Sequence, residues 1–277
     1  MLSVYCPGIK VRGQALIDLL LYMIAGVFVG LTSGLFGLGG GVVMVPAMLP
    51  IFAAQGMSVD VAMHVAVASS LATIVFTGVS SAHAHWRLGN VVFSVLPWLV
   101  LGLVLGALTG AQIAAALSGQ ALRFIFGLFL IVFSLRLFFG GQPDSARGMP
   151  TSPVVTIVGF LIGCLSSLVG IGGGTMVVPF LLWTGVVMRQ AVGTSAAAGI
   201  SIAVAGSIGF VWAGTGDDQL PAYSTGYIYW PAVFGVAVSS VIFAPIGARL
   251  ASRLPARLLQ RGFAIFLALV GLRLLLS

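Results

Sequence analysis

The feature that most constrains this chain is a glycine-rich block that occurs twice. Residues 30–46 read GLTSGLFGLGGGVVMVP, and residues 163–179 read GCLSSLVGIGGGTMVVP. The second block begins 133 residues after the first (163 − 30 = 133), and no gap is needed to align them. Each block interrupts a long apolar stretch, and helix-breaking residues are tolerated at membrane depth only where protein or a watery cavity satisfies the freed backbone groups. A corresponding pair of glycine-interrupted segments is typical of a transporter's binding site.

The composition places the chain in a membrane. Of its 277 residues, 60% are hydrophobic and 6% are charged, and the mean hydropathy is +1.18. A soluble domain carries about 25% charged residues. The apolar runs are continuous and suit helices that cross about 30 Å of hydrocarbon, so we predict an all-α polytopic membrane protein. Basic residues at helix ends set topology in such proteins, so the net charge of +7 does not indicate a nucleic-acid partner.

The apolar segments form two sets of five. The first set falls at residues 15–37, 42–54, 59–82, 91–117 and 122–140, and the second at 153–170, 175–188, 192–214, 227–250 and 256–276. The repeat extends beyond the glycine block, because AVASS at 66–70 resembles AVGTS at 191–195 and SLRL at 134–137 matches GLRL at 271–274. We therefore predict a first transmembrane repeat over residues 15–140, a cytoplasmic linker over 141–152 and a second transmembrane repeat over 153–277.

The charges that follow equivalent segments differ between the two copies. After the third segment, the first copy has His83, His85 and Arg87, which we expect in a loop, whereas the second copy has Asp217 and Asp218. After the fourth segment the bias reverses, because only the second copy has arginines there, four of them between residues 249 and 261. Under the positive-inside rule, equivalent loops then lie on opposite sides of the membrane. This predicts two inverted-topology repeats.

Inversion requires an odd number of crossings in each copy. The second segment of the second copy is short, since residues 175–185 would form about 16 Å of helix. We therefore interpret the first two segments of each copy as a hairpin that folds at the glycines, followed by about three transmembrane helices. The alternative is a single broken helix in each copy, which would give parallel repeats.

The glycine blocks have the chemistry of an anion site. Consecutive glycines leave the backbone bare and free to adopt positive φ, and a helix that begins there presents unpaired N–H groups and a partial positive charge. Such a terminus binds an anion without a basic side chain. Close helix packing, an ordinary role of small residues in membrane helices, is the alternative. The glycines that we assign to substrate binding are Gly37, Gly39, Gly40, Gly41, Gly170, Gly172, Gly173 and Gly174.

Four hydroxyl side chains are the next candidates for substrate binding. Ser69 and Ser70 lie in the middle of the third segment of the first copy, and Thr194 and Ser195 are their counterparts in the second. These hydroxyls can donate to an anion, or they can bond to the carbonyls of the preceding helical turn. No His/Cys cluster has metal-ligand spacing, so we predict no metal, no cofactor and no catalytic residue.

The doubled block resembles that of the sulfite exporter TauE/SafE family of membrane permeases. The resemblance rests on residues 30–46 and 163–179, is supported by the AVASS and AVGTS elements, and covers residues 15–277. The second block departs slightly, with Ser167 in place of Gly34 and Val169 in place of Phe36. The resemblance implies transport of small sulfur-containing or organic anions, such as sulfite, sulfonates or sulfoacetate, across the bacterial inner membrane. The residues themselves indicate only an anion near the midplane.

The predicted function is that of a secondary transporter of small anions that works by alternating access between the two repeats. An anion channel is the first alternative. A membrane-embedded enzyme or assembly factor is the second, although an enzyme would carry clustered titratable residues in the membrane and those of this chain are scattered. The expected partners are a small anionic substrate and the lipid bilayer, and a homodimer is allowed. The coupling ion and the direction of transport stay open.

Overall fold

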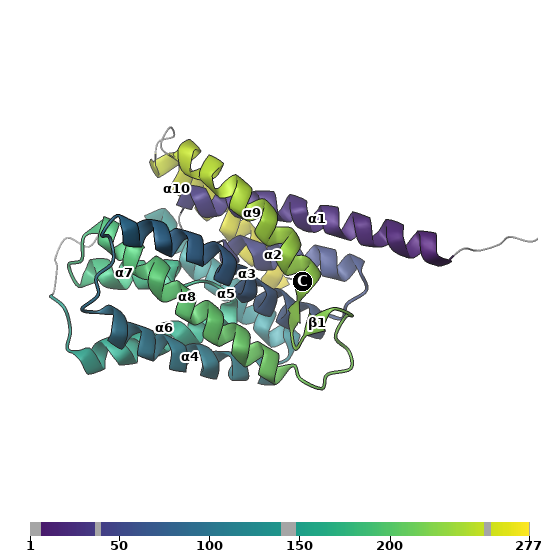
Figure 1. The fold of residues 1–277 in the computed structure, drawn as a ribbon, viewed down its shortest axis with the longest axis horizontal. Helices are drawn as coiled ribbons and strands as arrows, with labels where there is room; N and C mark the ends of the chain where they lie inside the picture. Colours follow the sequence, from purple (N-terminus) through teal and green to yellow (C-terminus); the bar gives the residue numbers. More distant parts are fainter. Residues whose placement is uncertain (1–6, 37–39, 140–147, 252–255, 277) are drawn as a thin grey trace, which may run out of the picture.

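The computed structural model describes residues 7–36, 40–139, 148–251 and 256–276 as a bundle of helices (Figure 1). Seven of the described helices are long and apolar enough to cross a membrane, and α2 and α7 are shorter apolar helices. The elements are α1 (Pro7–Phe36), α2 (Gly41–Ala54), α3 (Val59–Arg87), α4 (Leu96–Ala116), α5 (Gly119–Phe139), α6 (Ser152–Val169), α7 (Gly174–Trp183), α8 (Met188–Ala213), β1 (Ser224–Thr225), β2 (Ile228–Tyr229), α9 (Trp230–Ala251) and α10 (Ala256–Leu276).

These elements confirm the predicted all-α membrane fold. Each predicted segment contains one helix, and α1 to α5 correspond in order to α6 to α10. The expectation of a loop around His83 and His85 is wrong, because α3 continues as far as Arg87. The predicted linker falls mostly on residues 140–147, which lie outside the described residues.

The first glycine block folds α1 and α2 into a hairpin. A Cβ built on Gly40 would lie 2.7 Å from Cγ1 of Val29, so the start of α2 lies beside the last third of α1. At the far end of α2, Nε2 of Gln55 donates to the hydroxyl of Tyr22 at 2.7 Å. The helix α2 therefore runs back along α1, as the hairpin interpretation predicts.

The second block ends α6 with a left-handed glycine. Gly170 has φ 68°, and the N–H groups of Gly170 and Ile171 donate to the carbonyls of Ser167 and Ser166 at 3.2 and 2.9 Å. This is the Schellman arrangement, in which a residue with positive φ satisfies the last carbonyls of a helix. Gly173 then caps the first turn of α7.

The two copies exchange their first helices. The most extensive packing between helices joins α1 to α9 and α4 to α6. The first helix of each copy therefore packs along the fourth helix of the other. Small residues permit this close approach: a Cβ on Gly110 of α4 would lie 2.9 Å from Cα of Cys164 in α6. The equivalent helices α3 and α8 contact each other, and so do α5 and α10.

Both pairs of equivalent helices pack antiparallel. In the pair α3 and α8, Gly78 of α3 lies against Ile200 of α8. Leu71, earlier in α3, lies against Gly206, later in α8. In the pair α5 and α10, Gly127 lies against Leu275, whereas Phe138 lies under the guanidinium of Arg261. In each pair the residue number falls in one helix as it rises in the other, so equivalent helices of the two copies run in opposite directions.

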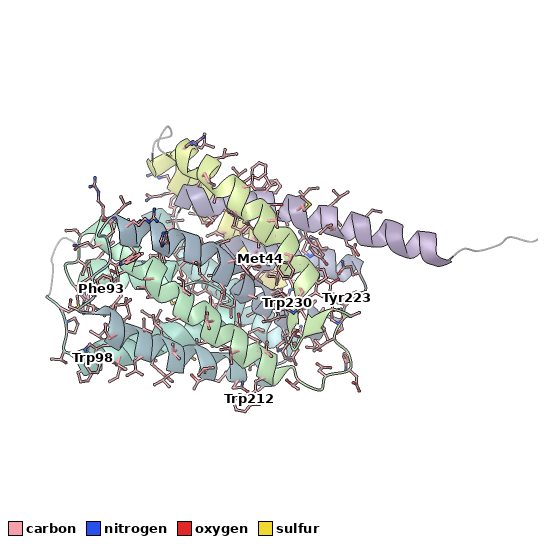
Figure 2. All side chains as sticks on the ribbon, viewed as in Figure 1. Met44, Phe93, Trp98, Trp212, Tyr223 and Trp230 are labelled. Carbon is pink, nitrogen blue, oxygen red and sulfur yellow. The ribbon has the colours of Figure 1, made fainter. Side chains whose placement is uncertain are left out.

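The core of the bundle is built around α3. Every residue of this helix from Val61 to Ile74 is buried. The outer surface carries exposed aromatic side chains such as Trp98 and Trp212 (Figure 2), which suit the interface between hydrocarbon and headgroups. The middle of α3 is therefore the longest continuous buried stretch among the described residues, and both glycine blocks contact it.

Candidate functional site

The two glycine blocks touch each other beside the middle of α3. A Cβ on Gly41 would lie 2.6 Å from the carbonyl oxygen of Gly170, so no larger residue fits at Gly41 without a shift of backbone. The side chain of Ile74 packs against both blocks, at 3.0 Å from a Cβ on Gly41 and 3.3 Å from one on Gly172. The described residues of the two blocks are thus in contact, and Gly37 and Gly39 lie outside the described residues.

A cavity of about 120 Å³ lies beside the second block. Gly172, Gly173 and Gly174 of the block line it, together with Ser195 and Gly199 of α8. A water molecule takes about 30 Å³ of liquid, so the cavity has room for roughly four waters or for one small oxyanion. The remaining lining residues are Ser33, Ile74, Thr77, Gly78, Ser81, His85, Val178, Val192 and Ala196.

The start of α7 gives this cavity its electrostatic character. The first intrahelical bonds run from the N–H groups of Met176 and Val177 to the carbonyl of Gly173, at 3.2 and 2.7 Å. The N–H groups before them have no partner within the helix, and the helix dipole adds partial positive charge at this end. No acidic side chain is among the described residues that line the cavity. The arrangement favours an anion over a cation.

One face of α3 adds polar groups that the sequence reasoning missed. Thr77, Ser81 and His85 follow at intervals of four residues, which places them on one side of the helix, and all three line the cavity. The cavity therefore extends along α3 from Ile74 to His85, about 16 Å at 1.5 Å per residue. The four-residue spacing was the signal that could have identified this polar face.

Two of the four predicted hydroxyls accept hydrogen bonds from the backbone of the other copy. The Ser69 hydroxyl accepts from the N–H of Tyr229 at 3.0 Å, and the Thr194 hydroxyl accepts from the N–H of Val92 at 2.9 Å. Tyr229 and Val92 lie just before α9 and α4, so each contact joins the third helix of one copy to the start of the fourth helix of the other. Both side chains anchor the entry to the fourth helix of the opposite copy, and neither lines the cavity.

The other two hydroxyls differ from each other. The Ser70 hydroxyl donates to the carbonyl of Gly170 at 2.8 Å and so ties α3 to the second glycine block. Its counterpart Ser195 is one of the residues that line the cavity, and the buried Ser195 hydroxyl has no hydrogen-bond partner among the described residues. Of the predicted site residues, the structure therefore gathers Ser195 with Gly172, Gly173 and Gly174 around one space.

Comparison with known proteins agrees with this architecture. Residues 22–274 match the family model described as Sulfite exporter TauE/SafE. The chain belongs to this family. It is 34% identical over 260 residues to a probable membrane transporter protein of Haemophilus influenzae, a match that covers 94% of this chain and 98% of the relative.

Two more distant relatives match over nearly their whole length. A probable membrane transporter protein of Methanocaldococcus jannaschii is 26% identical over 97% of this chain and 99% of its own. A probable membrane transporter protein of Bacillus subtilis is 23% identical over 91% of this chain and 96% of its own. No solved structure matches the chain. Because the family match and the names of these relatives agree, the TauE/SafE protein described here is a membrane transporter.

Proposed function

We propose that the protein is a secondary transporter of small sulfur-containing anions, such as sulfite, sulfonates or sulfoacetate, in the bacterial inner membrane. One observation carries the proposal. A cavity of about 120 Å³ joins the N-terminus of a membrane-embedded helix to the buried Ser195 hydroxyl, which has no partner among the described residues. Backbone N–H groups at a helix start are suited to bind an anion.

In this proposal some groups around the cavity bind the anion and others hold the helices in place. The backbone N–H groups at Gly173 and Gly174 and the hydroxyl of Ser195 donate to the oxygens of the anion. Ser69, Ser70 and Thr194 hold the helices that carry those donors, because their hydroxyls bind backbone groups. The polar face of α3 provides the path between the cavity and one side of the membrane.

We further propose that residues 15–140 and 153–277 are inverted repeats joined by a cytoplasmic linker, and that their relative motion alternates access to the anion. The antiparallel packing of α3 on α8 supports this arrangement and puts the end of α3, with Arg87, beside the start of α8, with Arg189. Clustered basic residues indicate the cytoplasmic side. The cavity extends toward that side, whereas the contact of Gly41 with Gly170 closes the first block.

Counterflow in liposomes tests this function. The purified protein should exchange labelled sulfite for unlabelled sulfite inside the vesicles, and internal methanesulfonate should stimulate the same uptake while internal acetate should not. Stimulation by acetate alone would overturn the sulfur-anion class. Uptake without any stimulation from the inside would indicate a channel instead.

A glycine substitution tests the location of the site. A Cβ at Gly173 would already lie 3.1 Å from side chains of Val177 and Ile202, so Gly173→Leu should fill the cavity and abolish exchange. Gly262→Leu is the control, because a Cβ at Gly262 finds open space among the described residues. Normal exchange in a folded Gly173→Leu protein would overturn the proposed site.

A further inference from the structure

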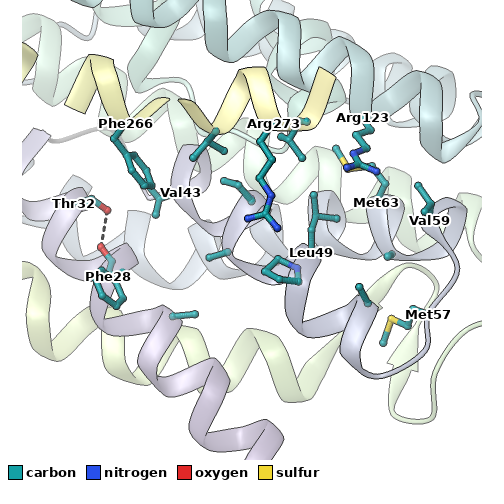
Figure 3. Close-up of a pocket in the computed structure, with 18 of the residues that line it drawn as sticks. Phe28, Thr32, Val43, Leu49, Met57, Val59, Met63, Arg123, Phe266 and Arg273 are labelled. Carbon is teal, nitrogen blue, oxygen red and sulfur yellow. Dashed lines mark hydrogen bonds between the residues drawn. The ribbon is translucent and has the colours of Figure 1, made fainter. Parts of the chain in front are cut away.

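A second hollow of the molecule shares no lining residue with the cavity beside the second glycine block. It is an apolar groove of about 650 Å³ between the hairpin of α1 and α2 and the helices α5 and α10, and we call it the α2–α10 groove (Figure 3). Apolar side chains such as Val43, Leu49 and Met63 form its walls. This size and character suit an alkyl chain better than a small hydrated ion.

Two arginines reach into this apolar space. Arg123 comes from the first turns of α5 and Arg273 from the last turn of α10, and Figure 3 shows both side chains directed into the groove. Because α5 and α10 pack antiparallel, these two positions lie at the same end of the helix pair. The Nε atom of Arg123 is buried and has no hydrogen-bond partner among the described residues. A buried cationic donor without a partner is costly, which favours an anion in the groove.

The surroundings indicate that the anion comes from the membrane. No acidic residue is among the described residues that line the groove. Phe28 and Phe266 line it as well, with 61% and 43% of their side-chain surfaces exposed. In a bilayer those surfaces face lipid chains. The groove therefore joins a lipid-exposed apolar surface to a pair of guanidinium groups.

We propose that the α2–α10 groove binds an anionic phospholipid. The phosphate pairs with the guanidinium groups of Arg123 and Arg273, and an acyl chain lies along the apolar wall. Guanidinium suits phosphate because its planar donors match the oxygens in pairs. The proposal is independent of which anion the protein transports, because the groove contains none of the residues assigned to the glycine-block cavity.

The equivalent groove of the second copy provides an internal comparison. It lies between α5 and α7, measures about 440 Å³ and contains Arg136, the counterpart of Arg273 (273 − 136 = 137). The same offset puts Gln260 at the position of Arg123 (260 − 123 = 137). A second cation at this position therefore occurs in the first copy alone, and Arg123→Gln replaces it with the residue that the second copy uses.

Lipid binding to the purified, delipidated protein tests the proposal. We expect dioleoyl phosphatidylglycerol to raise the thermal unfolding midpoint and to remain bound in native mass spectrometry, and dioleoyl phosphatidylcholine, which has the same chains, to bind more weakly. Arg123→Gln should weaken phosphatidylglycerol binding by about fivefold, the effect of one interfacial cation. Arg123→Lys should retain the preference, and Arg189→Gln, an exposed site at the start of α8, should leave it unchanged.

Other outcomes would overturn the proposal. Equal binding of the two lipids by the wild-type protein would do so, as would an equal loss in Arg123→Gln and Arg189→Gln. Glycerol phosphate, a headgroup without chains, and octanesulfonate, a soluble amphiphile, separate the sources of the anion. If either one displaces phosphatidylglycerol at equal concentration, the groove is a site for a soluble anion and not for a membrane lipid.

Discussion

The middle of α3 and the middle of α8 occupy equivalent places in the two copies, yet they pack differently against the glycine blocks. Ser70 corresponds to Ser195, and the same offset pairs Ile74 with Gly199 (199 − 74 = 125). Ile74 packs against both glycine blocks, whereas at Gly199 a Cβ would approach only the backbone nitrogen of Gly173, at 3.4 Å. One side chain thus fills the space in α3 that stays open in α8.

The equivalent serines Ser70 and Ser195 also differ between the two copies. Ser70 donates to the carbonyl of Gly170, while the buried hydroxyl of Ser195, a residue that lines the cavity, has no partner among the described residues. The duplicated sequence gives each copy a glycine block and a serine at the same position of its third helix. The difference between isoleucine and glycine four residues later accompanies a closed contact in one copy and a cavity in the other.

The strongest way to break this comparison is to make α8 resemble α3. Gly199→Ile should fill the cavity beside Gly173 and reduce counterflow by about a hundredfold, which corresponds to roughly 3 kcal/mol of activation free energy. The measurement is the initial rate of sulfite exchange in liposomes. Gly262→Ile, in open space on α10, should exchange at the wild-type rate. Full activity of Gly199→Ile would show that the cavity has no part in transport.

A pair of alanine substitutions separates the backbone role of the second block from its role around the cavity. Gly170 has φ 68°, and a Cβ there would lie 3.0 Å from backbone atoms of Val67, so Gly170→Ala should lower the free energy of unfolding by about 1–3 kcal/mol. Gly172 needs no positive φ and its Cβ would meet only the side chain of Ile74, so Gly172→Ala should be milder. Thermal unfolding in detergent measures both, and an equal loss would contradict this account.

The two equivalent serines should respond differently to alanine. Ser195→Ala removes a donor to the bound anion, so it should raise the KM for sulfite about tenfold, in line with a hydrogen bond to a charged group, and should leave thermal stability nearly unchanged. Ser70→Ala leaves the buried carbonyl of Gly170 unpaired, so it should lower stability by about 1–3 kcal/mol. Paired KM and unfolding measurements check this. A stability loss in Ser195→Ala without a change in KM would remove Ser195 from the binding site.

The smallest expected effect belongs to Ile74→Val. Loss of one buried methylene should cost about 0.5–1.5 kcal/mol of stability, measured by thermal unfolding. Sulfite exchange should continue at close to the wild-type rate, because the smaller valine does not reduce the volume of the cavity around Gly173. A large loss of exchange would mean that the contact between Ile74 and the two blocks takes part in the transport cycle.

The sequence was sufficient to predict most of the helices and the hairpin of α1 and α2. Continuous apolar runs and the doubled block place the helices, and the short second segment indicates that the chain turns back at the glycines. The partners of the hydroxyls could not be predicted. Ser69 and Thr194 bind Tyr229 and Val92, contacts that span 160 and 102 residues and depend on how the third helix of each copy packs against the other copy.

The sequence also could not predict that the cavity lies beside the second glycine block. Gly199 is one of 38 glycines, and nothing in its local pattern distinguishes it from the glycines that serve helix packing. Its significance comes from its position opposite Gly173. The polar face of Thr77, Ser81 and His85 could have been predicted from its four-residue spacing, provided that α3 was expected to continue past residue 82.

The central claim is that the anion binds between the start of α7 and Ser195. Anomalous diffraction from crystals grown with bromomethanesulfonate, a sulfonate marked by its bromine, tests this most directly. The account predicts a bromine peak inside the cavity, with the sulfonate oxygens within hydrogen-bond distance of the N–H groups at Gly173 and Gly174 and of the Ser195 hydroxyl. A peak that is instead confined to the α2–α10 groove, beside Arg123 and Arg273, with an empty glycine-block cavity, would contradict it.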